Sequence, residues 1–123
     1  MIRPASTRRA SNRAPGMTPE AFRSWRVDGM AVSQADAARI LGYGKDQVQF
    51  YEAGVRRDGG PAPVPVAVAY ACMATFLGLP RWTFDDLATD EATKNRLLRL
   101  REQVQKAMQD VGLSTEHPEK RVL

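Results

Sequence analysis

Two short helices joined by a glycine turn dominate the middle of this sequence and constrain its fold more than any other feature. Ser33, followed three residues later by Asp36, is a capping signal that starts the first helix. Gly42 can adopt the positive φ angle that ends a helix, so the pattern predicts helices over residues 34–41 and 45–53. Their lengths and spacing are those of a helix-turn-helix.

The two helices differ in the side chains that they can bury. Because the helices of this motif cross steeply, the first must present a small residue near the crossing, and Ala38 meets this requirement. The second helix has an apolar face made of Val48 and Tyr51, three residues apart, which we expect to lie in the core. This assignment leaves five side chains of the second helix exposed: Lys45, Asp46, Gln47, Gln49 and Phe50.

The segments on either side of this motif are also helical in pattern. Thr18 before Pro19 predicts the start of a helix whose apolar face contains Phe22 and Trp25. A further helix opens at Pro65, after a loop rich in glycine and proline. Its expected core face consists of four apolar residues: Val66, Tyr70, Met73 and Leu77. No convincing strand or internal repeat is present, so the sequence predicts an all-α protein.

Near its C-terminus the chain is expected to form one long helix, from about Asp90 to Val111, with Gly112 as its stop. Apolar or small residues recur along it at spacings of three and four, as in the seam of a coiled coil. These residues are Leu97, Leu100, Val104, Ala107 and Val111. Such a seam can fold back on the preceding domain or pair with a second copy of the chain, and we predict dimerisation.

The chain is expected to divide into four segments. They are a disordered basic arm (residues 1–16), a helix-turn-helix domain (17–80), a connector with the C-terminal helix (81–113) and a frayed tail (114–123). The formal net charge of +4 lies entirely in the arm, because bases and acids balance in each of the other segments. The arginines of the arm are Arg3, Arg8, Arg9 and Arg13. They can follow DNA phosphates or enter a minor groove, the alternative being a tail that only aids solubility.

The inventory of reactive residues excludes several kinds of site. Cys72 alone cannot form an internal disulfide, and with His117 it is too little for a Cys/His zinc cluster. Asp85 and Asp86 are better explained as a helix start than as acid–base catalysts, so we expect no enzymatic activity, cofactor or metal. The longest mostly apolar stretch, residues 64–79, is shorter than the roughly 20 residues that span a bilayer. No apolar segment follows the basic start of the chain, so a cytoplasmic location is expected.

The segment 32–44, together with Val48, Tyr51-Glu52 and Gly54, resembles the Xre-type family, the helix-turn-helix domains of phage Cro and repressor proteins. The family pattern is Leu-Ser-Gln, Leu-Ala three residues on, Gly at the turn, then Val, Trp-Glu and Gly. The resemblance extends over residues 17–79. It implies a compact, λ-repressor-like domain of four to five helices that binds DNA, usually as a dimer on a palindromic operator.

The sequence departs from the family pattern in four places. One residue more than usual lies between Arg26 and Val32, which alters the first connection. Gly44 stands where the family has Ser or Thr, Ala37 where it has leucine, and Phe50 where it often has a polar side chain. These departures affect the expected choice of DNA sequence more than the expectation that DNA is bound.

The resemblance implies that residues 45–53 form the helix that enters the major groove. There Gln47 or Gln49 can pair with adenine through two hydrogen bonds, and Phe50 can either contact a thymine methyl group or turn inward. Gln34, with the N-terminal amides of the first helix, is placed to donate to a phosphate. The full set of expected contacts from the domain is Gln34, Lys45, Asp46, Gln47, Gln49, Phe50, Arg56 and Arg57.

The function expected from these patterns is sequence-specific binding of double-stranded DNA by a bacterial or phage-derived transcriptional regulator. Occupancy of a promoter would then change the access or recruitment of RNA polymerase, alone or with a second regulatory protein. The alternative belongs to another class of protein. It is an antitoxin-like or adaptor module that holds a partner protein through its helical surface and C-terminal helix.

Overall fold

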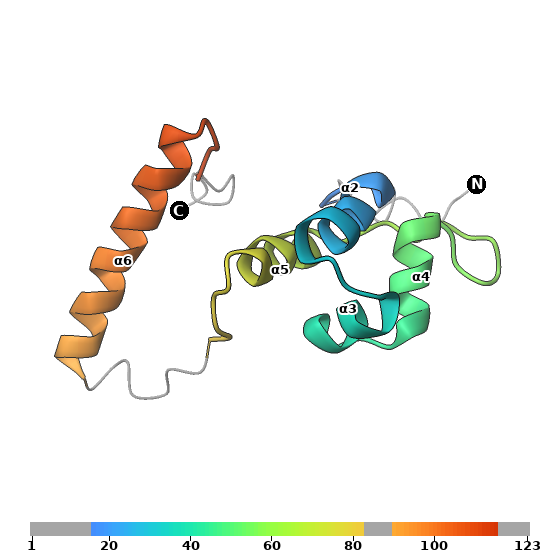
Figure 1. Cartoon of the computed structure of the whole chain (residues 1–123), viewed down its shortest axis with the longest axis horizontal. Coiled ribbons are helices and arrows are strands. Elements are labelled where there is room, and N and C mark those ends of the chain that lie inside the picture. The colour runs from blue at the N-terminus through green and yellow to red at the C-terminus, as the bar shows by residue number, and fades with distance from the viewer. Residues whose placement is uncertain (1–15, 83–89, 116–123) are drawn as a thin grey trace, which may run out of the picture. The chain divides into compact units, whose positions relative to one another are not determined.

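The computed structural model describes residues 16–82 and 90–115 (Figure 1). The chain forms two compact units, Met1–Arg81 and Trp82–Leu123, and each is treated separately below. The described residues form helices and two isolated β-bridges, Met17 with Val64 and Val55 with Pro61, and no strand. The prediction of an all-α protein is therefore confirmed over these residues.

The first helical segment begins as an α-helix and continues as a π-helix. The α-helical part is α2 (Pro19–Ser24), and the hydroxyl of Thr18 caps it by accepting from the Ala21 N–H at 3.0 Å. The π-helical part is η1 (Trp25–Met30), which ends at Ala31 in the left-handed conformation, with φ of 56°. A π-helical turn holds more residues than an α-helical turn. The helix is therefore wider over Trp25–Met30 than in α2.

The helix-turn-helix is formed by α3 (Gln34–Leu41) and α4 (Lys45–Ala53), with the bounds that the sequence predicts. The Ser33 hydroxyl accepts from the Asp36 N–H at 3.1 Å, which confirms the cap at the start of α3. Gly42 ends α3 at φ 78°, a conformation that a residue with a Cβ atom adopts only with strain. The local signals of the sequence thus fix both helices.

The core of the first unit is centred on Phe22, which has no exposed surface. Its ring lies 5.5 Å from that of Trp25 and 5.4 Å from that of Tyr51, measured between ring centroids. Val48 is also fully buried, and Ala38 is 4% exposed, as the steep crossing of the two helices requires. These contacts fix α4 against α2 and α3.

Helix α5 (Val66–Phe76) packs against η1 and α3, but through a face that the sequence did not predict. The expected core face is wrong, because all four of its members are exposed: Val66, Tyr70, Met73 and Leu77. Val68 and Cys72 are buried instead. The helix is apolar on nearly all sides, so its periodicity does not select a face. The smaller side chains around Cys72 let α5 approach the bulky Trp25. Packing against Trp25 determines which face of α5 is buried.

The second unit contains one long helix, α6 (Glu91–Asp110). The Asp90 carboxylate caps it by accepting from the Thr93 N–H at 3.2 Å, and Gly112 follows its end at φ 86°. The predicted helix is confirmed. None of its side chains is buried. Within the described segments, no helix combines the length and apolar character needed to cross a membrane.

Candidate nucleic-acid interface

An ion pair between Arg26 of η1 and Glu52 of α4 fastens the outer helix of the motif to the first helical segment. The Arg26 guanidinium donates to both carboxylate oxygens of Glu52, and its third bond goes to the Val32 carbonyl oxygen at 3.0 Å. The two side chains are only 13% and 9% exposed. Because both side chains are largely shielded from water, the loss of either charge would leave the other without compensation, which is costly.

The same carboxylate positions two glutamines on the outer side of the motif. Gln34 Nε2 donates to Glu52 Oε1 at 3.1 Å. Gln49 Nε2 in turn donates to Gln34 Oε1 at 3.4 Å. The chain of contacts therefore runs from the half-buried ion pair, through the half-buried Gln34 at the start of α3, to the exposed Gln49 on α4. We call these four residues, Arg26, Glu52, Gln34 and Gln49, the glutamine relay.

The electrostatics of Glu52 follow from these contacts. Burial is the largest single influence and acts to raise the pKa of Glu52. The hydrogen bonds from Arg26 and Gln34, together with the positive charge of Arg26, outweigh it and lower the pKa below its usual value of 4.5. Glu52 is therefore ionised at neutral pH, and its oxygens act only as acceptors for both donors.

The other predicted contacts of α4 differ in exposure. Lys45 and Asp46 are exposed at its N-terminal end, whereas Gln47 and Phe50 are half-buried. Two roles are expected for Phe50, contact with a thymine methyl group or packing in the core. Its half-buried side chain is intermediate between the exposure that each role would require. Gln49 is thus the most accessible of the predicted base-contacting amides.

Two arginines beyond α4 lie near carboxylates. Arg57 Nη2 donates to Asp46 Oδ2 at 3.1 Å, and both side chains are largely exposed. Arg56 Nε lies 3.9 Å from Asp58 Oδ1. The pairing of Arg57 with Asp46 offsets the one acid on the exposed end of α4, which would otherwise repel phosphates.

Several predicted residues lie outside the described part of the chain. The arm arginines Arg3, Arg8, Arg9 and Arg13 are among them, as are Asp85, Asp86 and His117. Of the predicted seam of α6, Leu97 and Val104 are half-buried. The remaining members, Leu100, Ala107 and Val111, are exposed.

Sequence reasoning assigned no role to Arg26 and Glu52, which are 26 residues apart. One local signal was available, because Gln49 and Glu52 are separated by three residues and so share a face of α4. That spacing indicates a polar cluster on this helix but does not identify its partner on η1.

Among residues 16–82 and 90–115, no three His, Cys, Asp or Glu side chains are grouped so that they could hold a metal ion. No protein-family model, curated protein or solved structure matches this chain.

Proposed function

We propose that the chain is a sequence-specific DNA-binding regulator of the Xre type, which inserts α4 into the major groove. The observation that carries this proposal is the glutamine relay. A long polar side chain on an exposed helix normally has many conformations, and fixing it costs about 0.5–1.5 kcal/mol on binding. Here Gln34 already holds the amide of Gln49 before any DNA is present.

The hydrogen-bonding capacity of Gln49 supports a base contact. Its amide has two N–H donors and one oxygen acceptor, and Gln34 engages one donor. The second donor and the oxygen remain for DNA. These two groups match N7 and the N6 amino group of adenine in the major groove, a pairing that discriminates by about 1–3 kcal/mol.

Phosphate contacts then place the helix. The N-terminal amides of α3 and the second N–H of Gln34 lie beside the relay and can donate to a backbone oxygen. Lys45 and Arg56 add positive charge close to α4. The body of the domain is neutral, so the arm arginines are proposed to supply most of the long-range attraction to DNA.

The proposal can be tested by selecting bound duplexes from a random DNA pool with the full chain and then measuring the affinity of the best duplex. Gln49→Ala should weaken binding by about 5- to 150-fold, the range that corresponds to one lost base contact. Gln109→Ala, at an exposed glutamine of α6, is the matched control and should leave affinity unchanged. Both variants should unfold at the temperature of the parent chain, since neither side chain is buried.

No enrichment of a sequence from the pool would contradict the proposal. So would an equal effect of both substitutions, because α6 would then contribute as much as α4.

The alternative function, an antitoxin-like or adaptor module, is favoured by a different observation. Tyr70 and Phe76 of α5 are 55% and 56% exposed, and α6 has no buried side chain. Exposed apolar surface of this kind is typical of protein contacts. This reading predicts a partner protein whose binding survives Gln49→Ala and is lost when Tyr70 and Phe76 are both replaced by serine.

A further inference from the structure

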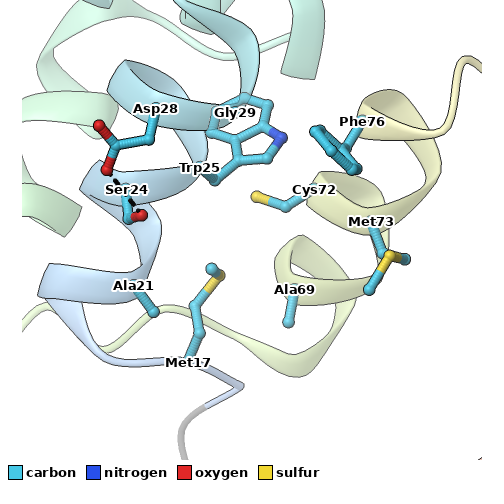
Figure 2. Close-up of a pocket in the computed structure, with 10 residues that line it drawn as sticks. All are labelled: Met17, Ala21, Ser24, Trp25, Asp28, Gly29, Ala69, Cys72, Met73 and Phe76. Atoms are coloured by element: carbon cyan, nitrogen blue, oxygen red, sulfur yellow. Dashed lines mark hydrogen bonds between the residues drawn. The ribbon is translucent and has the colours of Figure 1, made fainter. Parts of the chain in front are cut away.

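A groove with a volume of about 470 Å³ lies between the α2–η1 segment and α5, within the first unit (Figure 2). Its apolar walls are formed mainly by Met17, Ala21, Trp25, Ala69, Met73 and Phe76. The volume falls within the range of about 300–1,000 Å³ that small-molecule sites occupy. The groove is separate from the glutamine relay, none of whose residues contributes to its lining.

One polar group in the groove lacks a partner. The indole N–H of Trp25 is buried and has no hydrogen-bond partner among residues 16–82 and 90–115, and the residue is only 8% exposed. Figure 2 shows this nitrogen on the edge of the ring that faces α5, across from Phe76. A buried donor without an acceptor costs about 1–3 kcal/mol, so a donor in this position favours a molecule that brings an acceptor.

Small residues keep the groove open. A Cβ atom at Gly29 would lie 3.3 Å from a ring carbon of Phe76, a tight contact that only a shift of the ring would relieve. Ala21 and Ala69 stand on opposite walls, where longer side chains would fill the space. The π turn contributes Trp25 and Gly29 to the same wall, so the widened helix helps to shape the site.

The charges around the groove restrict what it can bind. Among the described lining residues only Asp28 carries a charge, and its Oδ2 accepts from the Ser24 hydroxyl at 3.0 Å. Cys72 also lines the groove, and burial raises the pKa of its thiol to about 11, so this group is neutral at physiological pH. Within the described lining, an anion would therefore meet the carboxylate of Asp28 and no compensating base.

We propose that this groove binds a small, uncharged and mainly apolar molecule whose carbonyl oxygen accepts a hydrogen bond from Trp25 Nε1. The apolar body of the molecule lies against Met17, Met73 and Phe76. Flexible methionines and an aromatic ring adapt to different apolar shapes, so the carbonyl position is the more specific requirement. The proposal does not depend on DNA binding, because neither the groove nor its test involves the relay.

The test uses cyclohexanone as the probe and the full ¹⁵N-labelled chain without DNA. The sequence has two tryptophans, so the spectrum should contain two indole N–H signals, and Trp82→Phe identifies the one from Trp25. We expect cyclohexanone to move the Trp25 indole proton downfield in a saturable manner and to leave the Trp82 indole proton in place. Cyclohexanone has no ring current, so a downfield shift reports a new hydrogen bond.

Two leucine substitutions in α5 distinguish the groove from the rest of the surface. Ala69→Leu should abolish the shift by filling the groove, whereas Ala67→Leu, at an exposed position of the same helix, should behave as the parent chain. Ala21→Leu fills the groove from the opposite wall and gives the same test if Ala69→Leu does not fold.

Three results would overturn the proposal. The first is no shift of the Trp25 signal up to the solubility of the probe, or equal shifts of both indole signals. The second is a shift that persists when the groove is filled by leucine. The third is a Trp25 signal that moves with protein concentration alone, which would assign the groove to a second copy of the chain.

Discussion

The helix-turn-helix unit and α6 are both helical, but different forces hold them in that conformation. In the first unit short helices of 6 to 11 residues surround a shared core centred on Phe22, and an ion pair ties η1 to α4. Helix α6 has 20 residues and no buried side chain. Within residues 90–115, the Asp90 cap and an exposed pair between Lys94 and Glu91 support it locally.

This difference shows where function can be inferred from packing. Helices shorter than about 12–15 residues are marginal alone, so α3 and α4 depend on the core that presents them. Helix α6 has an apolar seam, but none of its side chains is buried in a core. We therefore propose that the seam, Leu97, Leu100, Val104, Ala107 and Val111, is a contact between two copies of the chain, which would suit a palindromic DNA site. Met108, also half-buried, was not predicted and extends this face.

The largest expected loss of stability follows a substitution in the core of the first unit, and this loss should be confined to that unit. Phe22→Ala removes a fully buried ring and should lower the free energy of unfolding by about 3–5 kcal/mol. Leu97→Ala, on α6, should change the unfolding of the first unit by less than about 0.5 kcal/mol, because Leu97 belongs to the second unit. Chemical denaturation followed by near-ultraviolet circular dichroism measures both values. Equal losses would show that the two regions share one core.

A smaller effect is expected at the ion pair. Glu52→Gln leaves the Arg26 guanidinium without its counter-charge in a nearly buried position, and should cost about 2–3 kcal/mol. Asp36→Asn, at the exposed pair with Arg39, is the control and should cost at most about 1 kcal/mol. A similar cost at both sites would contradict the role of Glu52 in fastening α4.

The ion pair also predicts how stability changes with acid. Because the folded-state pKa of Glu52 is lowered, its contribution is complete above the usual pKa of 4.5 and is lost as the pH falls through the lowered value. The stability of the parent chain should therefore fall more steeply below pH 4.5 than that of Glu52→Gln. Parallel curves for the two proteins would show that Glu52 titrates normally.

A substitution in the seam of α6 is expected to have the smallest effect on stability. It should nevertheless have a clear effect on the oligomeric state. Leu100→Asp should convert a dimer into a monomer in sedimentation experiments and leave the unfolding of the first unit unchanged. Asn95→Asp, at an exposed position of α6 outside the seam, adds the same single negative charge and should leave the mass unchanged. A Leu100→Asp protein that keeps the mass of a dimer would exclude this seam as the contact.

The sequence predicts those parts of the fold that depend on local signals. Ser33 and Gly42 are sufficient to place the ends of α3, because a cap and a left-handed turn act within a few residues. The face of α5 could not be predicted, because a helix that is apolar all round takes its orientation from its neighbours. The same limit applies to the site: Gln34 and Gln49 were identified by pattern, whereas the contact between Arg26 and Glu52 joins residues that only the fold brings together.

The most direct test of the account is whether Gln49 contacts adenine N7 in the bound duplex. Replacing each adenine of the selected site in turn by 7-deazaadenine removes that acceptor without changing the base pair. At one position the parent chain should lose about 5- to 150-fold in affinity, while Gln49→Ala should bind the normal and modified duplexes equally. If every modified adenine weakens the parent chain and Gln49→Ala to the same extent, Gln49 does not read adenine and the proposed role of the relay is wrong.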